Sequence, residues 1–217
     1  MAAEIVIEDL AAGQALLGVS WRVGPGERFA VHGAGAPLAE LLAGLRRPDR
    51  GTVHADGGIG LAAAEPALFD RLTCREQLAA FAALHRREPP ELLATVGLAA
   101  FADHREDRLS PERRRRLGLA CALVAEPAAL VLDAGPGELW PVLATLPQTV
   151  LFTTDDPAEA ARADRVALLG HGRLLTVDRP ADLVAALDAE RRLLDPTASP
   201  ATLADVLRHL GGREAIP

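Results

Sequence analysis

Two almost unbroken apolar runs, residues 130–132 (LVL) and 149–152 (TVLF), constrain the fold of this chain more than any other feature. Neither run alternates apolar and polar side chains, as a strand with one face in water would. Strands that are buried on both faces are typical of the centre of a parallel sheet covered by helices. Acidic residues follow both runs, with Asp133 after the first and Asp155 and Asp156 after the second. We therefore expect an α/β fold in which these acids share one edge of the sheet.

Shorter patterns divide the rest of the chain into a β-rich start, a helical middle and a helical tail. Thr73 and Glu76 have the spacing of a capping box at a helix start, and residues 170–173 predict a hairpin turn. Strands are expected at residues 5–7, 19–23, 28–31, 52–54 and 165–169, and helices at 37–45, from 73, at 111–125, at 157–163, and from 180 onward with a break at 195–200.

The composition favours a soluble globular protein, because 49% of the 217 residues are apolar and 24% are charged. This length suits one domain, or one domain with a small inserted lobe. No apolar run reaches the ~18–20 residues that a membrane span needs. The first ten residues carry acids where a signal peptide would carry basic residues, so we expect a cytoplasmic location. The net charge of −7 disfavours nucleic acid as a partner.

The chain contains no lysine, because all 23 of its basic residues are arginine. This absence excludes a Schiff-base mechanism and also excludes the lysine that neutralises phosphate in a P-loop. The two cysteines, Cys74 and Cys121, have neither the spacing of metal ligands nor a disulfide framework. We expect both cysteines to pack inside the helical middle of the chain.

A series of short motifs is specific as a set, although each motif alone is weak. In chain order they are residues 18–20 (GVS), 24–27 (GPGE), 41–45 (LLAGL), 48–53 (PDRGTV), 65–69 (EPALF), 108–110 (RLS), 114–117 (RRRL), 130–133 (LVLD), 164–169 (DRVALL) and 171–173 (HGR). Together they resemble the nucleotide-binding domain of ATP-binding cassette (ABC) transporters. The resemblance implies a P-loop NTPase-like core with a parallel sheet, an N-terminal antiparallel β-lobe and an inserted helical lobe at about 73–125. These parts would form one domain at 1–187, followed by a C-terminal helical extension at 188–217.

The resemblance fails where that family binds phosphate. The family places a G-x-x-x-x-G-K-[ST] loop between a strand and a helix, and its amides, lysine and hydroxyl hold the phosphates and Mg²⁺. Here the loop consists of Gly33, Ala34, Gly35 and Ala36 followed by Pro37. It is about four residues shorter than the family's loop and has no Lys, Ser or Thr. These four residues are the candidate remnant of a nucleotide cleft.

Other nucleotide-contacting positions of the family are also altered. Ala64 stands where the family has a glutamine, and residues 109–113 read L-S-P-E-R where the family has L-S-G-G-Q. Ala134 stands at the position of the family's catalytic glutamate, and Asp155 at the position of its switch histidine. Ser110 survives as a phosphate donor of the remnant cleft, whereas Glu112 would repel a γ-phosphate. The segment between Asp133 and Thr149 is roughly ten residues short, so the family's dimer-contacting loop and its helix are mostly absent.

Asp133 and Asp155 are the candidate metal ligands, because carboxylates at one sheet edge can bind Mg²⁺ or Mn²⁺. Asp133 matches the acid that ends the family's Walker B strand. The alternative role for Asp155 or Asp156 is to cap the helix that starts at Pro157.

Residues 113–116 form a run of four arginines on the expected helix at 111–125. The run could contact an anion or an acidic lipid. The interpretation that we favour is a solvated helix face that pairs with Glu112 and nearby acids.

Three functional hypotheses follow from these observations. The preferred one is an ABC-type subunit that does not hydrolyse ATP, binds ATP–Mg²⁺ weakly or not at all, and acts by binding a membrane permease subunit or a competent ABC ATPase at the inner face of the membrane. A homodimer also fits, and the docking surface is expected near residues 64–73. The alternatives are an ATPase subunit with an atypical ATP site, and a repurposed scaffold or small-molecule-binding protein.

Overall fold

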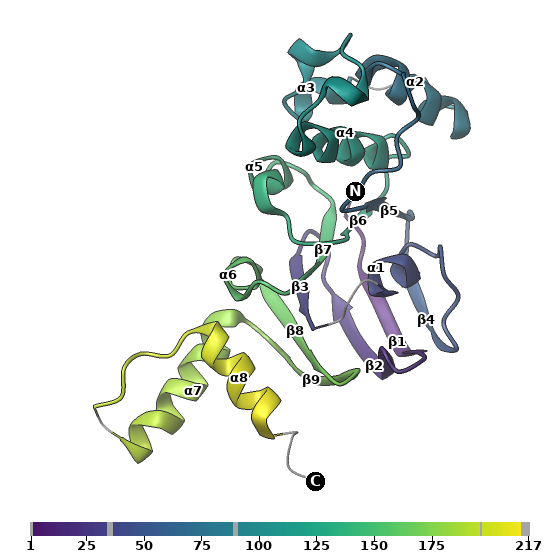
Figure 1. Cartoon of the computed structure of the whole chain (residues 1–217). Helices are drawn as coiled ribbons and strands as arrows, with labels where there is room; N and C mark the ends of the chain where they lie inside the picture. Colours follow the sequence, from purple (N-terminus) through teal and green to yellow (C-terminus); the bar gives the residue numbers. More distant parts are fainter. Residues whose placement is uncertain (1, 34–36, 89–90, 196, 214–217) are drawn as a thin grey trace.

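The centre of the fold is a six-stranded sheet. The structure is a computed structural model that describes residues 2–33, 37–88, 91–195 and 197–213. The strand order is β5-β6-β7-β3-β8-β9, and all neighbours are parallel except β8 and β9 (Figure 1). The strands are β3 (Arg28–His32), β5 (Ile59–Ala62), β6 (Ala129–Leu132), β7 (Thr149–Thr154), β8 (Arg165–Gly170) and β9 (Arg173–Asp178). Every residue of β6 and β7 is buried. The expected α/β fold with a parallel sheet is therefore confirmed.

A second, antiparallel sheet forms the N-terminal β-lobe. Its strands, in the order β2-β1-β4, are β1 (Ile5–Ala12), β2 (Leu16–Val23) and β4 (Arg50–Ala55). The indole of Trp21 stacks on the ring of Phe29 with 6.3 Å between centroids, which joins the two sheets through one apolar cluster. Helix α1 (Pro37–Leu42) packs in the same cluster. It ends three residues before the expected position 45, because Gly44 takes a left-handed conformation with φ +72°.

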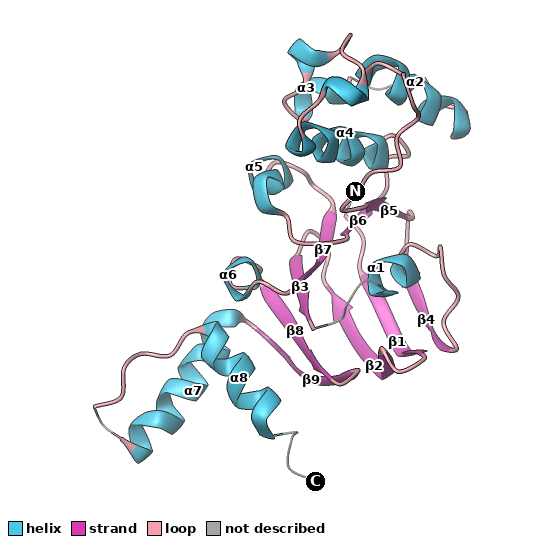
Figure 2. Cartoon of the chain, viewed as in Figure 1, coloured by secondary structure: helices cyan, strands magenta, loops and turns pink. Residues whose placement is uncertain are grey.

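The residues between β5 and β6 form the helical lobe (Figure 2). Its helices are α2 (Cys74–Leu84), α3 (Leu92–Thr95) and α4 (Pro111–Leu123), with 3₁₀ turns at Ala99–Phe101 and Glu106–Arg108. The predicted capping box at the start of α2 is confirmed. The Thr73 hydroxyl accepts the Glu76 N–H at 3.3 Å, and the Glu76 carboxylate accepts the Thr73 N–H at 2.8 Å. Apolar side chains of this lobe and of the central sheet form one cluster.

Both cysteines are buried in this lobe, as expected. Burial raises the pKa of the Cys121 thiol to about 12 and also raises the pKa of Cys74. At pH 8 only about one Cys121 side chain in 10⁴ is then a thiolate, which is the reactive form. We predict that neither thiol of the folded protein reacts readily with Ellman's reagent at pH 8, and that both react in concentrated guanidinium. A thiol that titrates rapidly in the folded protein would contradict this prediction.

The shortened segment between β6 and β7 contains a 3₁₀ turn (Gly137–Leu139) and the single-turn helix α5 (Trp140–Leu143). Trp140 is buried and meets the ring of Phe152 edge to face, with 5.6 Å between centroids. The Arg162 guanidinium lies over the same indole at 4.5 Å. Trp140 therefore covers apolar surface of the sheet.

The short helix α6 (Pro157–Ala160) connects β7 to β8, and the tail consists of α7 (Pro180–Leu194) and α8 (Leu203–Arg213). Helix α6 is shorter than the expected 157–163, because the Asp164 N–H already bonds the Arg28 carbonyl at 2.8 Å as the chain enters β8. Helix α7 continues without a break across residues 187 and 188, and Leu187 belongs to the large core cluster. The division into 1–187 and 188–217 stays a prediction.

Candidate functional site

The carboxyl ends of β3, β6 and β7 meet at one edge of the sheet (Figure 1). Gly33 follows β3, Asp133 follows β6, and Asp155 follows β7, so the topology brings these three candidates to the same edge. Ala34, Gly35 and Ala36 lie outside the described residues. Ser110 lies apart from this edge, at the start of α4 in the helical lobe.

Gly33 is required by backbone geometry at the end of β3. Its φ is +81°, and a Cβ atom at this position would lie 2.5 Å from the carbonyl oxygen of Leu169. The glycine therefore lets the chain leave β3 close to the end of β8, whether or not a phosphate is bound. The helix beyond the loop begins with Pro37, which has no N–H to offer an anion.

His32 cannot replace the positive charge of the missing lysine. Burial lowers the pKa of its imidazole, and the nearby carboxylates of Asp155 and Asp156 offset this only in part. The ring is therefore neutral at pH 7. At neutral pH the His32 ring therefore supplies no positive charge to this edge.

The acids of this edge do not form a complete metal centre. The part of the chain that the structure describes contains no group of three or more His, Cys, Asp or Glu side chains that could hold an ion. Asp156 caps α6 by accepting the Ala158 N–H at 2.8 Å, which confirms the alternative role for this residue. Asp133 and Asp155 remain as a pair, so a hard cation here would take most of its ligands from water or from a bound phosphate.

Ala134, at the position of the family's catalytic glutamate, presents only a methyl group, and Glu159 does not replace the missing carboxylate. One Glu159 oxygen accepts the Gly137 N–H and the other accepts the Thr154 hydroxyl, both at 2.9 Å. With both oxygens engaged, Glu159 holds the loop after β6 and is poorly placed to activate water. The sequence gives no signal for this contact, because Glu159 and Gly137 lie on different elements.

Ser110 acts as the N-cap of α4. Its hydroxyl accepts the Arg113 N–H at 3.4 Å, and Pro111 supplies the first helical position. Glu112 follows in the first turn, where it forms an ion pair with Arg116 at 2.8 Å. These contacts explain the local sequence as a helix start without any phosphate.

The run of four arginines at 113–116 makes more contacts with the rest of the protein than the expected solvated helix face would. Arg113 stacks over the ring of Phe101 at 4.0 Å, and Arg116 pairs with Glu112 as expected. Arg115 reaches out of the helical lobe and donates to the Gly135 carbonyl at 2.8 Å and to Glu138 at 3.2 Å. Sequence reasoning missed this link between α4 and the loop after β6. The remaining arginine, Arg114, is exposed and has no side-chain hydrogen bond to any described residue.

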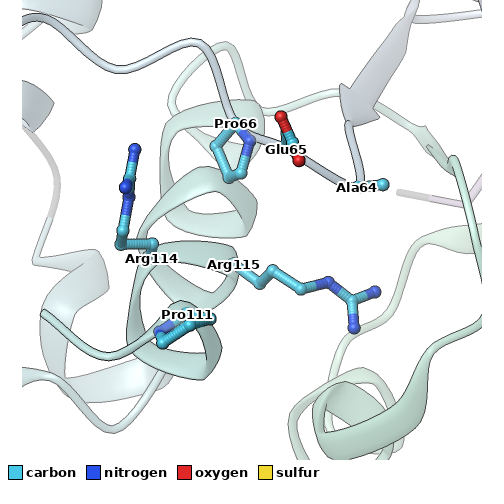
Figure 3. A pocket seen from close by; sticks show the side chains of 6 residues that line it. All are labelled: Ala64, Glu65, Pro66, Pro111, Arg114 and Arg115. Atoms are coloured by element: carbon cyan, nitrogen blue, oxygen red, sulfur yellow. The ribbon is translucent and has the colours of Figure 1, made fainter.

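A groove of about 400 Å³ separates the loop after β5 from the start of α4 (Figure 3). It is lined by Ala64, Glu65, Pro66, Pro111, Arg114 and Arg115. Pro66 packs against α4 at Gly118, where a Cβ atom would lie 2.5 Å from the proline ring. Its lining residues 64–66 begin the segment 64–73, near which the family resemblance predicts partner docking.

Solved structures and curated relatives agree on the class of protein that this architecture defines. The structure of cbiO1 from Clostridium perfringens, part of the ABC transporter complex cbiONQ, superimposes with a TM-score of 0.72 at 20% identity, covering 98% of each chain. A structure of an ATP-binding subunit of an ABC transporter gives a TM-score of 0.73 at 21% identity, covering 95% of this chain and 98% of that one. The fold is that of an ATP-binding cassette.

Sequence similarity gives the family. The family model described as ABC transporter matches residues 16–135. The aliphatic sulfonates import ATP-binding protein SsuB of Ralstonia nicotianae is 35% identical over 190 residues, which cover 74% of this chain and 66% of SsuB. The sulfate/thiosulfate import ATP-binding protein CysA of Mycobacterium bovis is 33% identical over 177 residues, which cover 67% of this chain and 50% of CysA. The chain belongs to the ABC transporter family and corresponds to its ATP-binding domain.

The match spans half to two thirds of the length of these two relatives. Within the described ranges, no helix combines the length and the apolar character needed to cross a bilayer.

Proposed function

We propose that this chain is an ABC-type subunit that does not hydrolyse ATP and acts by binding other proteins at the inner face of a membrane. The family membership supports an origin as an ATP-binding subunit. The altered phosphate positions argue against retained catalysis, because each charged contact to phosphate contributes about 1.5–3 kcal/mol and each transition-state contact about 10²–10³ in rate.

The observation that carries the proposal is the electrostatics of the sheet edge around Gly33. No lysine exists in the chain, His32 is neutral, and Asp155 puts an acid at the position of the family's switch histidine. Loss of three phosphate contacts weakens nucleotide affinity by roughly 10³-fold or more. Any ATP–Mg²⁺ bound in the remnant of residues 33–36, or at Ser110, would then be held weakly.

The groove lined by Pro66 and Arg114 is the proposed docking surface. The resemblance to ABC cassettes suggests a cytoplasmic loop of a permease as the occupant, or a competent ABC ATPase bound alongside the chain. Both walls of the groove are well ordered by contacts that need no nucleotide, such as the packing of Pro66 on Gly118. A role in binding, independent of ATP, therefore suits this surface.

We predict that titration of the purified chain with a fluorescent ATP analogue and Mg²⁺ does not saturate below about 1 mM, since the phosphate contacts are missing. We also predict that ATP turnover stays at the level of the buffer. Asp133→Asn is the control variant: contaminating ATPase would be the same in both preparations, whereas turnover by this chain would fall. Micromolar binding, with turnover that Asp133→Asn abolishes, would favour the alternative of an ATPase with an atypical site.

A further inference from the structure

Helix α7 has one face against the protein and one face in solvent. Helices α7 and α8 lie side by side beyond β9, at the end of the molecule away from the helical lobe (Figure 1). The inner face of α7 packs in the large core cluster through Leu183, Val184 and Leu187. Asp188 adds a bond to the segment before α8 by accepting the Ala201 N–H at 2.5 Å. The residues of the outer face are exposed, so this face is available to a partner.

The outer face of α7 combines small apolar residues, two opposite charges and a leucine. A helix turns by about 100° per residue, which places four exposed residues within about 40° of the direction opposite Leu187. These are Asp182, Ala185, Ala189 and Arg192. Ala181 and Leu193 flank them on either side. With 87% of its surface exposed, Leu193 is the most exposed large apolar side chain in the described ranges, and the adjacent Leu194 is 84% exposed.

The charged side chains at this face have little or no engagement with the described chain. Asp182 and Arg192 form no ion pair and no side-chain hydrogen bond with a described residue. The same holds for the side chain of Arg179, the N-cap residue of α7. Asp195, the C-cap residue, uses one carboxylate oxygen to accept the N–H and hydroxyl of Thr197, and its other oxygen has no described partner.

These four charges are arranged symmetrically about Leu187. Asp182 and Arg192 lie five residues before and after it, and Arg179 and Asp195 lie eight residues before and after it. If two α7 helices pack antiparallel and cross at this point, Asp182 faces Arg192 of the second copy, and Arg179 faces its Asp195. A twofold axis repeats each contact. A parallel pair would place like charges together, so the charges favour the antiparallel arrangement and a partner with the same sequence.

We propose that two copies of this chain associate through the outer faces of α7, packed antiparallel about a twofold axis near Leu187. Ala185 of each copy meets Ala189 of the other, and these small side chains let the helix axes approach to about 8 Å. Leu193 then covers Ala181 of the second copy and leaves water. One helix from each copy makes a small interface, which is typical of transient association. This association goes beyond the proposed function and uses none of the nucleotide-contacting positions.

Sedimentation equilibrium of the full chain, without nucleotide and at low salt, measures the association. We expect a monomer–dimer equilibrium with a dissociation constant of about 10–100 µM. Asp182→Arg and Arg192→Asp should each weaken the dimer at least ~10-fold, because the contact occurs twice and its attraction becomes repulsion. Asp70→Arg, at an exposed acid between β5 and α2, changes the net charge as much as Asp182→Arg does and should leave the dimer unchanged.

Mixing the two charge-reversal variants tests the antiparallel geometry itself. The Asp182→Arg chain carries two arginines on this face, and the Arg192→Asp chain carries two aspartates. Neither matches itself, yet one copy of each satisfies both contacts of an antiparallel pair. We expect an equimolar mixture to dimerise with a dissociation constant within about threefold of the wild-type value. Melting temperatures identify a variant that fails to fold, in which case Asp182→Asn and Arg192→Gln replace the reversals and should each weaken the dimer about threefold.

Several results would overturn the inference. They are a chain that stays monomeric up to about 1 mM, a dimer that no α7 substitution weakens, folded reversal variants that do not pair when mixed, or a dimer that forms only with ATP–Mg²⁺. Binding of a monomeric chain to acidic lipid vesicles through Leu193 would also overturn it and assign the face to a membrane. None of these results bears on ATP turnover or on the groove between the lobes, so failure here is distinct from failure of the proposed function.

Discussion

Replacing Arg28 with methionine is expected to lower the free energy of unfolding by about 3 kcal/mol or more. The guanidinium donates to four backbone carbonyls, those of Gly26 (2.6 Å), Leu143 (2.6 Å), Leu146 (2.7 Å) and Gln148 (3.0 Å). Methionine keeps much of the apolar stem but leaves these acceptors without their charged donor. Chemical denaturation followed by circular dichroism measures the loss.

Arg173→Met is the matched control for Arg28→Met. Arg173 is an exposed arginine at the start of β9, and the structure describes no hydrogen bond from its side chain. Its replacement should change stability by no more than about 0.5 kcal/mol. If both variants unfold at the same denaturant concentration, the four carbonyl contacts contribute nothing and the argument for Arg28 is wrong.

The role of Arg28 bears on function because its partners lie in the shortened segment between β6 and β7. Three of the four carbonyls belong to residues 143–148, at the end of helix α5 and in the loop after it. Together with buried Trp140, the guanidinium closes this side of the sheet where the family has a longer loop and helix. Contacts within the chain thus stabilise the segment between β6 and β7, where the resemblance predicts that most of the family's dimer-contacting segment is missing.

Local patterns in the sequence predicted those helices, strands and turns that are determined by neighbouring residues. The apolar runs at 130–132 and 149–152 predicted β6 and β7, because a strand that is buried on both faces has consecutive apolar residues. The capping box at Thr73 and the hairpin at 170–173 were predictable for the same reason. Helix ends were less predictable, since a distant strand pairing ends α6 at Ala160.

The candidate site was predictable only in part. Asp133 and Asp155 were expected at one sheet edge, because each follows an apolar run typical of a central parallel strand. The bonds of Arg115 to the loop after β6 and the lowered pKa of His32 were not predictable. Both depend on the distance between elements far apart in the sequence, and a single sequence contains no direct record of that distance.

Gly51→Ala is expected to destabilise the protein by about 3–5 kcal/mol, lowering the melting temperature by roughly 10 °C. Gly51 lies in β4, within one of the motifs that carry the family resemblance, and has φ +87°. A Cβ atom there would lie 2.2 Å from the carbonyl oxygen of Asp9 and 2.4 Å from that of Glu8. Both neighbours are backbone atoms of β1, so the antiparallel pair of β1 and β4 must separate to admit a methyl group. Calorimetry measures the shift.

Gly58→Ala separates collision from backbone strain in this prediction. Gly58 has a similar φ of +81°, yet a Cβ atom there would have no neighbour within 4 Å. The strain of a left-handed alanine alone costs about 1 kcal/mol, so Gly58→Ala should lose far less stability than Gly51→Ala. Similar losses in the two variants would mean that β1 and β4 tolerate a methyl group between them. In that case the glycine of this motif would be required for its backbone conformation, and the close approach of the two strands would not explain it.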